Sequence, residues 1–253
     1  MMRLAPMTIA AAMILAAAPD ARAWNIVNLA VGAKGMVGGN LWTQPENIPP
    51  SEIGFTDARG GYGGGGGVFA EVRVIKYIAL EVDLLWERNN IWENQSWHVG
   101  PFTFQTTTHA RATTMRIPIL VKGILPLGGV RLGLGLGPEF VVPLSTSADV
   151  DYKQANMVQD PNLFHVTADW ATMLTVDLDI TICLWKGLHL PIDLRASYNL
   201  TQSKDWNDRV SWTRNGQPIP ENQVKPGDMP DGFQVNYQNS WDFRLLLGLG
   251  YEF

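Results

Sequence analysis

The clearest pattern in the chain is the alternation of apolar and polar positions along its last thirteen residues. From Trp241 to Phe253 every odd-numbered residue is large and apolar, whereas the even-numbered residues are mostly small or charged. Side chains of a β-strand point to opposite faces in turn, so this period predicts a strand with one apolar face. At about 3.3 Å per residue and a tilt of about 40°, such a strand crosses the apolar band of a transmembrane barrel, roughly 25 Å tall.

Earlier parts of the chain carry the same period of two. Apolar residues again fall on one face and charged or small residues on the other, which predicts seven further strands. These segments are roughly 26–38, 66–75, 78–87, 110–124, 130–144, 166–184 and 188–199.

The connections between these segments alternate in length. Short turns fall near Lys76, Gly128 and Lys186, and long segments fall near 39–65, 88–109, 145–165 and 202–239. Tight turns on one side and large loops on the other are typical of an up-and-down barrel in a membrane. The sequence therefore predicts an all-β fold: an eight-stranded antiparallel up-and-down transmembrane β-barrel with four long outer loops and short periplasmic turns.

Two of the long segments have features of their own. Trp212–Gly216 contains Asn-Gly, which predicts a hairpin turn, and the prolines that follow indicate that this hairpin projects beyond the membrane without joining the barrel. Gly60–Gly67 lacks the Lys and Ser/Thr of a phosphate-binding loop, and predicts a flexible loop that leads into the second strand.

The amino-terminal segment has the pattern of a secretory signal peptide. Arg3 gives a positive start, residues 7–18 are apolar, and Ala21-Arg22-Ala23 is a small-x-small cleavage site. The apolar run is too short for a membrane-spanning helix of about 20 residues, and no other run is long enough. We expect residues 1–23 to be a signal peptide and residues 24–253 to form one barrel domain.

Charge and cysteine content narrow the class of protein further. Removal of residues 1–23 takes away two arginines and one aspartate, which shifts the formal net charge from −5 to −6. A mildly acidic chain is not suited to phosphate backbones, so we expect no nucleic-acid partner. The single cysteine, Cys183, excludes an intrachain disulfide, and we expect it to fill space in the lumen.

Alternation alone does not decide which face meets water, because a soluble calyx of the lipocalin type would bury the apolar face. Here the apolar faces carry almost no charge, as lipid requires, since a basic residue facing lipid near the midplane costs about 2–4 kcal/mol. Glycines such as Gly133 and Gly135 gather on the polar face, and aromatic residues fall near strand ends. The apolar face is therefore predicted to point outward to lipid.

The opposite face is then the lumen, and its charges nearly balance. An eight-stranded barrel is just wide enough for side chains to fill it, and buried charges need partners. We predict an internal salt-bridge network that seals the lumen, with a narrow, porin-like channel as the alternative. The network residues are Lys34, Glu71, Arg73, Glu81, Asp83, Arg116, Arg131, Glu139, Asp177, Asp179, Asp193, Arg195, Asp242 and Arg244, with Lys122 and Glu252 on the same face.

Four short motifs resemble a known family. They are Met115–Lys122, Gly135–Glu139, Ile192–Tyr198 and the terminal Tyr251–Phe253. In this order they resemble the small bacterial outer-membrane β-barrel family (OmpA/OmpX-like, PorT-type "porin family" outer membrane β-barrel domain). The resemblance implies eight strands, a place among the lipid and lipopolysaccharide of the outer membrane, and insertion by the barrel-assembly machinery. It also implies that Tyr251 and Phe253 are the assembly signal.

Candidate catalytic and metal-binding groups are sparse. His165 and Thr167 lie on one strand face, as the base and nucleophile of a catalytic dyad would. No carboxylate that could orient the histidine as the third member of a triad is identifiable, so a hydrolase or acyltransferase is not favoured. His189 is expected to hydrogen-bond within the lumen network near Asp193. His98 and His109 lie in or near a loop with Glu93, and a metal site there is an alternative that the residues do not favour. Aspartates of the longest loop could bind calcium, but their spacing matches no calcium loop with defined ligand positions; they are Asp205, Asp208, Asp228 and Asp231. We expect no catalytic residues, no metal site and no cofactor.

Tryptophans in the long segments are the main candidates for binding. Trp92, Trp97, Trp206 and Trp212 stand among acids and amides, where they could contact glycans or protein partners, or pack the loops. We therefore expect a non-enzymatic outer-membrane protein with a role in envelope structure or surface interaction. A surface adhesin or ligand-binding barrel that acts through its outer loops is the alternative, and a narrow channel is a further one.

Overall fold

The computed structural model confirms the predicted barrel and adds a second, smaller sheet. It describes residues 27–41, 58–74, 76–99, 102–152, 164–203, 205, 208, 210–215, 217–219 and 232–253. The predicted signal peptide, Trp206, Asp228 and Asp231 lie outside these residues. Predictions about the side chains of Glu93, Trp97, His98, His165 and Trp212 likewise fall outside the described part.

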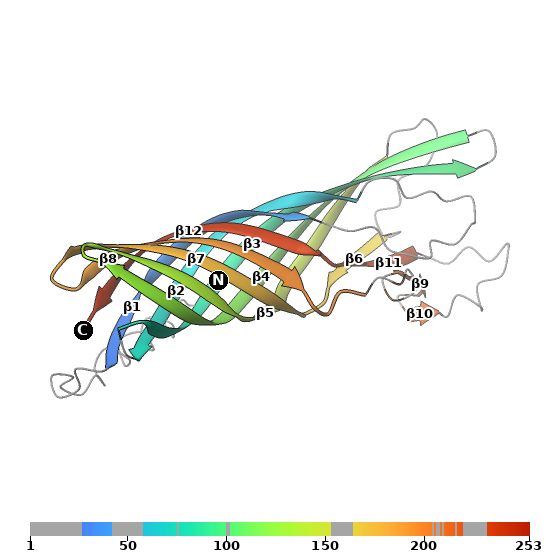
Figure 1. Cartoon of the computed structure of the whole chain (residues 1–253). Coiled ribbons are helices and arrows are strands. Elements are labelled where there is room, and N and C mark those ends of the chain that lie inside the picture. Colours follow the sequence, from blue (N-terminus) through green and yellow to red (C-terminus); the bar gives the residue numbers. More distant parts are fainter. Residues whose placement is uncertain are drawn as a thin grey trace, which may run out of the picture.

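Eight strands close into one barrel (Figure 1). Around the barrel they follow the order β1-β12-β8-β7-β5-β4-β3-β2, and each neighbouring pair is antiparallel. The first and last strands close the ring, with Val31 opposite Tyr251 and Gly39 opposite Phe243. The strands are β1 Val27–Leu41, β2 Ala58–Val74, β3 Ile78–Val99, β4 Phe102–Leu127, β5 Val130–Tyr152, β7 Ala171–Trp185, β8 Leu188–Asn199 and β12 Trp241–Glu252.

Short turns join the strands at one end of the barrel, here named the turn end. Lys186 and Gly187 connect β7 to β8, and both have a positive φ, 40° and 88°. Gly128, which starts the turn between β4 and β5, has a φ of 70°. Two-residue turns with positive φ match the twist of the paired strands, so the turns predicted near these positions are confirmed.

At the opposite end, named the loop end, the strands are longer than predicted. Residues 88–99 and 102–109 of the predicted loop 88–109 belong to β3 and β4, which stay paired as far as Val99 opposite Phe102. These paired strands extend well beyond the barrel (Figure 1). Beyond the apolar band both faces of a strand can be polar, so the alternation stops although the backbone pairing continues. The β-branched run Thr106–Thr108 also favours a strand.

The glycine-rich segment 60–67 was predicted to be a flexible loop, and this prediction is wrong. It belongs to β2, and its residues 61–67 pair with both β1 and β3. A Cβ at Gly65 would lie 1.8 Å from the carbonyl oxygen of Trp86, and one at Gly67 would lie 1.9 Å from that of Leu84. Glycine is needed at these positions because the backbone of β3 approaches closely and cannot move aside as a side chain could.

The predicted long strand 166–184 is in fact two strands in two sheets. β6, Phe164–Ala168, is separated from β7 by Asp169 and Trp170, and it pairs in parallel with β11. The alternation of apolar and polar residues continues across Asp169 and Trp170, so the sequence does not show the break. The two strands differ only in the strands with which they pair.

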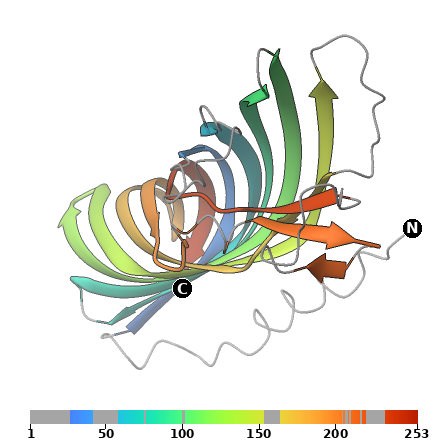
Figure 2. The same ribbon diagram turned by 90° about the vertical axis from the view of Figure 1, so that its right-hand side faces the viewer.

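The second sheet has four strands in the order β10-β9-β11-β6 and lies beyond the loop end (Figures 1 and 2). Its strands β9 (Val210–Arg214), β10 (Gln217–Ile219) and β11 (Gly232–Tyr237) come from the longest predicted loop. Arg214 pairs with Gln217, so the predicted hairpin is present and stays outside the barrel.

The apolar faces point outward, as predicted. Leu134 and Val121 are 63% and 59% exposed, whereas Lys122, between apolar residues on β4, is fully buried. Aromatic rings cluster near both ends, as in the pair Tyr198 and Trp241, whose centroids lie 4.9 Å apart. No helix among the described residues is long and apolar enough to cross a membrane. The exposed apolar side chains and the aromatic rings near both ends give the outward face the character of a lipid-facing surface around the barrel.

Candidate functional site

The middle of the lumen holds a dense group of charges, here named the central cluster. No member of it is more than 5% exposed. It is contributed by five strands and contains Lys34 from β1, Glu81 and Asp83 from β3, Lys122 from β4, Asp177 and Asp179 from β7, and Asp193 and Arg195 from β8.

Each cation of the central cluster contacts several carboxylates. Lys34 Nζ lies 2.6 Å from Asp193 Oδ2 and 2.7 Å from Glu81 Oε1. Lys122 Nζ lies 2.9 Å from Glu81 Oε2 and 3.0 Å from Asp177 Oδ2. The guanidinium of Arg195 contacts Asp83, Glu81, Asp193 and Asp177. These contacts tie strands from opposite walls together, so the cluster crosses the lumen.

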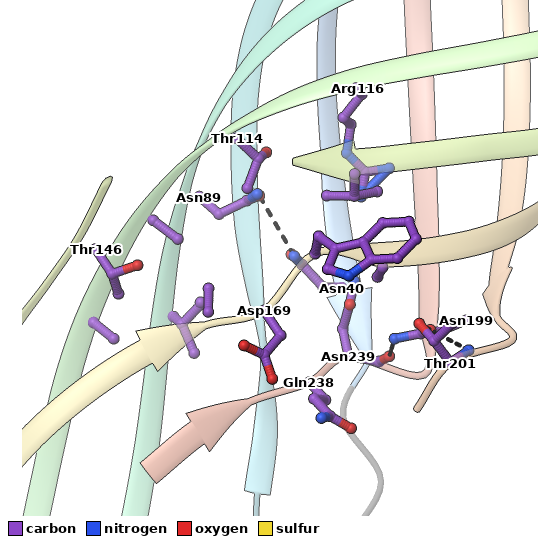
Figure 3. A pocket seen from close by; sticks show the side chains of 17 residues that line it. Asn40, Asn89, Thr114, Arg116, Thr146, Asp169, Asn199, Thr201, Gln238 and Asn239 are labelled. Atoms are coloured by element: carbon purple, nitrogen blue, oxygen red, sulfur yellow. Dashed lines mark hydrogen bonds between the residues drawn. The ribbon is translucent and has the colours of Figure 1, made fainter. Parts of the chain in front are cut away.

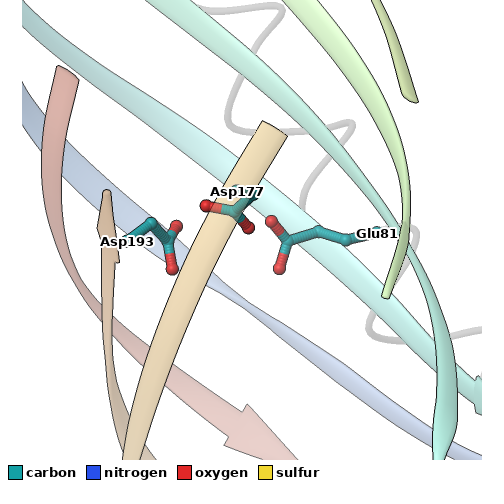
Figure 4. Close-up of side chains that lie close together, drawn as sticks. All are labelled: Glu81, Asp177 and Asp193. Atoms are coloured by element: carbon teal, nitrogen blue, oxygen red, sulfur yellow. The ribbon is translucent and has the colours of Figure 1, made fainter. Parts of the chain in front are cut away.

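Three carboxylates of the cluster, Glu81, Asp177 and Asp193, converge closely (Figure 4). Their oxygens lie within 4.8 Å of one another, a spacing that a metal ion could bridge. Lys34, Lys122 and Arg195 lie among these same carboxylates. The protein thus supplies cations to the group from its own side chains, and the arrangement is that of an ion-pair plug.

A second group lies toward the loop end and is named the loop-end cluster. It comprises Glu87, Arg116, Glu139, Asp242 and Arg244. Arg116 contacts Glu139 and Asp242, and its Nε lies 2.7 Å from Glu87 Oε2. Arg244 Nε donates to Glu87 Oε1 at 2.9 Å.

Neutral side chains complete the loop-end cluster. Thr175 and Ser197 donate to Glu139 Oε2 at 2.6 Å and 2.9 Å. Glu87 was not among the predicted network residues, although its position in the alternation of the third strand already placed it on the lumen face.

The third group closes the turn end and is named the turn-end cluster. Glu252 accepts from Arg73 NH1 at 2.9 Å and from Arg131 NH1 at 2.6 Å. Arg73 also contacts Glu71 at 2.9 Å. With this cluster, the structure brings all the charges predicted on the lumen face into three groups stacked along the barrel.

Glycines on β5 make room for the central cluster. A Cβ on Gly135 would lie 3.1 Å from both Asp177 Cβ and Lys122 Cγ, and one on Gly133 would lie 3.1 Å from Asp179 Cβ. Such contacts are tight, so a larger residue at either position would displace the charged side chains. Met36, Leu85 and Leu246 pack together in the lumen and fill further space.

Two predictions about lumen residues need correction. His189 faces the lumen, but its Nδ1 lies 3.3 Å from the carbonyl oxygen of Gly187, and its ring packs edge-on against Phe69 and not against Asp193. Cys183 does not fill the lumen, because it lies beside the turn and is exposed.

The remaining candidates lie apart from the lumen clusters. Trp92 is exposed on β3 and packs against Tyr62, with centroids 5.3 Å apart. His109 is exposed, and Asp208 accepts a hydrogen bond from the Ser203 hydroxyl.

The two predicted assembly residues lie together at the turn end. The rings of Tyr251 and Phe253 are 5.1 Å apart, and the amide of Phe253 donates to the carbonyl oxygen of Leu29. Their role as an assembly signal stays a prediction.

Comparison with known proteins gives only distant similarity. No protein-family model matches the chain, and no curated protein matches its sequence. Among solved structures, it is similar to the outer membrane protein OprG from Pseudomonas aeruginosa, at 10% identity over 90% of this chain and 96% of that one, with a TM-score of 0.44. Neisserial surface protein A (NspA) gives 12% identity over 89% and 97%, with a TM-score of 0.36.

The translocator domain of the autotransporter NalP from Neisseria meningitidis gives 12% identity over 98% of this chain and 97% of that one, with a TM-score of 0.26. At these values the description of the fold rests on the strand pairing of the chain itself. The resemblance to the OmpA/OmpX-like family stays a prediction.

Proposed function

We propose that the chain is a bacterial outer-membrane protein in which a sealed eight-stranded barrel anchors an extended β-structure for interaction at the cell surface. The observation that carries this proposal is the central cluster, which crosses the lumen and is at most 5% exposed. A barrel closed in this way serves better as an anchor than as a pore. The turn end would face the periplasm, and the loop end would face outward.

The apolar exterior supports the membrane location. Leu178, Leu194 and Leu245 are each about half exposed, at 46%, 51% and 45%, and they lie side by side on neighbouring strands at mid-height. Exposed leucines at this density are unfavourable in water and favourable against acyl chains. Outer-membrane lipid, lipopolysaccharide and the barrel-assembly machinery are the partners that this location implies.

The loop end supports surface interaction. The β3–β4 hairpin and the four-stranded sheet both project beyond the barrel at that end (Figure 1), where β3 presents Trp92 and the sheet ends in the edge strands β10 and β6. Unpaired strand edges and exposed aromatic rings are features on which partners bind. An adhesin-like role through these elements is therefore preferred to the channel, and a non-enzymatic role stays part of the proposal.

Orientation can be tested with the native cysteine. Cys183 is exposed at the turn end, so a membrane-impermeant maleimide should label it in lysed cells but not in intact ones. A Gln217→Cys variant on a Cys183→Ser background places the thiol in the projecting sheet, and it should be labelled in intact cells. The Cys183→Ser chain is the unlabelled control. Labelling of Cys183 in intact cells would overturn the proposed orientation.

Conduction and binding need separate experiments. Refolded protein in a planar bilayer should give no steady conductance steps, and steady steps would favour the channel.

A shortened β3–β4 hairpin tests binding. Residues 94–107 can be replaced by Asn-Gly, because Glu93 and Thr108 are directly opposite and a two-residue turn can join them. Cells with this shortened hairpin should capture less of any partner that pull-down from intact cells identifies. Unchanged capture would exclude the hairpin as the binding element.

A further inference from the structure

A cavity of about 440 Å³ lies at the loop end of the lumen, next to the loop-end cluster (Figure 3). Its size falls in the range of small-molecule sites, roughly 300–1,000 Å³. Its walls come from segments far apart in the sequence, including Asn40 on β1, Asn89 on β3, Thr114 on β4, Asn199 on β8 and Asn239 before β12. Trp170, in the link between β6 and β7, also lines it. We name this cavity the vestibule.

Two buried polar atoms of the vestibule have no partner in the protein. Asn40 Oδ1 and Thr114 Oγ1 make no hydrogen bond, although each side chain is only 6% exposed. The amide nitrogen of Asn40 donates to Asn89 Oδ1 at 3.4 Å, which leaves its oxygen open as an acceptor. Buried polar atoms without partners are rare in folded proteins, so an open acceptor and an open hydroxyl that line one cavity point to a ligand.

The strand geometry beside Thr114 is also irregular. Between Thr113 and Thr114 the pairing of β4 with β5 shifts by one residue, from Ser145 to Pro143. Such bulges change the direction of nearby side chains and are common next to binding sites. The unpartnered hydroxyl of Thr114 therefore lies at the position where the register between β4 and β5 changes.

The charges around the vestibule are already engaged. Arg116 is held by Glu87, Glu139 and Asp242, and Asp169 has its own interaction within the protein. The other polar groups that line the cavity are amides and hydroxyls, and Ile91 and Val141 add apolar wall. A ligand that fits must therefore be neutral, must offer several hydroxyl or amide groups, and must have an apolar face to set against Trp170.

We propose that the vestibule binds a neutral sugar of the size of a monosaccharide or disaccharide. Its hydroxyl groups donate to Asn40 Oδ1 and exchange hydrogen bonds with Thr114 Oγ1, while a ring face packs against Trp170. The proposal rests on the proposed function in one respect: the loop end must face outward for the sugar to come from the surroundings of the cell.

The test uses the refolded full-length mature barrel in micelles of lauryldimethylamine oxide, a detergent without a sugar headgroup. The probes are glucose, N-acetylglucosamine and maltose, compared with glucuronate and glucosamine as charged analogues. Saturation-transfer NMR should show saturable binding of at least one neutral probe, with the charged analogues at least tenfold weaker. No saturable binding, or equal binding of the charged analogues, would overturn the proposal.

Two variants locate the site. Thr114→Val keeps the shape of the side chain but removes the hydroxyl, and it should weaken binding of the neutral probe about tenfold. Thr113→Val changes the neighbouring threonine, which does not line the vestibule, and it should leave binding unchanged. Equal affinities of the two variants would place the sugar elsewhere. Because binding is measured on purified protein and orientation by cysteine labelling in cells, failure of this proposal and failure of the proposed function are distinguishable.

Discussion

The central cluster and the vestibule occupy the same lumen, and both are built on β1, β3, β4 and β8, yet they use polar side chains in opposite ways. In the central cluster long charged side chains reach across the barrel and meet, so Lys34, Lys122 and Arg195 each contact several carboxylates. In the vestibule most polar residues that the barrel strands contribute are short, as at Asn40 and Thr114, and a cavity is left between them. Side-chain length and charge therefore decide whether a stretch of the same lumen is a plug or a pocket.

The charged clusters and the vestibule also differ in how they satisfy polar groups. Glu139, in the loop-end cluster that lies between the central cluster and the vestibule, accepts from Arg116, Thr175 and Ser197. A few residues further toward the loop end, Thr114 has no partner for its hydroxyl. Loss of a polar group should therefore destabilise the barrel strongly in the central and loop-end clusters and hardly at all in the vestibule. The following predictions test that contrast.

Arg195→Met should have the largest effect. It removes the cation that contacts four buried carboxylates, and breaking such a buried network costs about 3–5 kcal/mol. Urea unfolding of the refolded protein in lipid vesicles, followed by tryptophan fluorescence, measures the loss. Arg88→Met on the exposed face of β3 is the control, with an expected change within about 0.5 kcal/mol. Equal midpoints for the two variants would contradict a structural role for the plug.

Leu194→Arg should have the next largest effect. Leu194 lies beside Asp193 and Arg195 in the sequence but points outward, where it is 51% exposed. A basic residue facing lipid near the midplane costs about 2–4 kcal/mol, and the cost falls to about 0–1 kcal/mol near the interface. Leu184→Arg, next to the turn, is therefore the matched control for the same unfolding measurement. If both variants lose the same stability, Leu194 does not lie closer to the bilayer midplane than Leu184 does.

Thr175→Val should have an intermediate effect. Its hydroxyl donates to buried Glu139 Oε2 at 2.6 Å, and a hydrogen bond to a charged group contributes about 1.5–3 kcal/mol. The unfolding midpoint in urea should fall accordingly, while the slope of the transition stays the same. An unchanged midpoint would mean that the remaining donors, Arg116 and Ser197, satisfy Glu139 without it.

Thr114→Val should cause the smallest loss of stability, at most about 0.5 kcal/mol, because its buried hydroxyl has no partner within the protein to lose. The comparison with Thr175→Val is well matched, since both threonines are buried on the lumen face and both lose only a hydroxyl. A loss as large as that of Thr175→Val would show that the vestibule hydroxyl is bonded within the protein, and would remove the contrast between the two regions.

Much of the barrel follows from local pattern. The closing strand, its apolar outward face and the strand at 188–199 match the alternation closely, because a period of two is a property of the backbone itself. The turns at Gly128 and Lys186 were predictable for a similar reason, since short connections between alternating segments leave few backbone conformations. The charges on the lumen face were also predictable as a set, because lipid excludes them from the other face.

The alternation of residues could not predict where the strands end or which strands pair with one another. Residues 58–65, 88–99 and 102–109 continue the barrel strands, and 164–168 joins another sheet, because outside the apolar band backbone pairing continues without any hydrophobic period. The vestibule was missed because it is made of short neutral residues, Asn40, Thr114 and Asn239, that are distant in sequence.

The sequence by itself determined the number of barrel strands, their direction and which face meets lipid, since each of these depends on neighbours along one chain. Only the tertiary structure decided which lysine meets which carboxylate, where the plug ends and where the cavity begins. Those features depend on the register between strands, which closure of the barrel fixes across residues far apart in the chain.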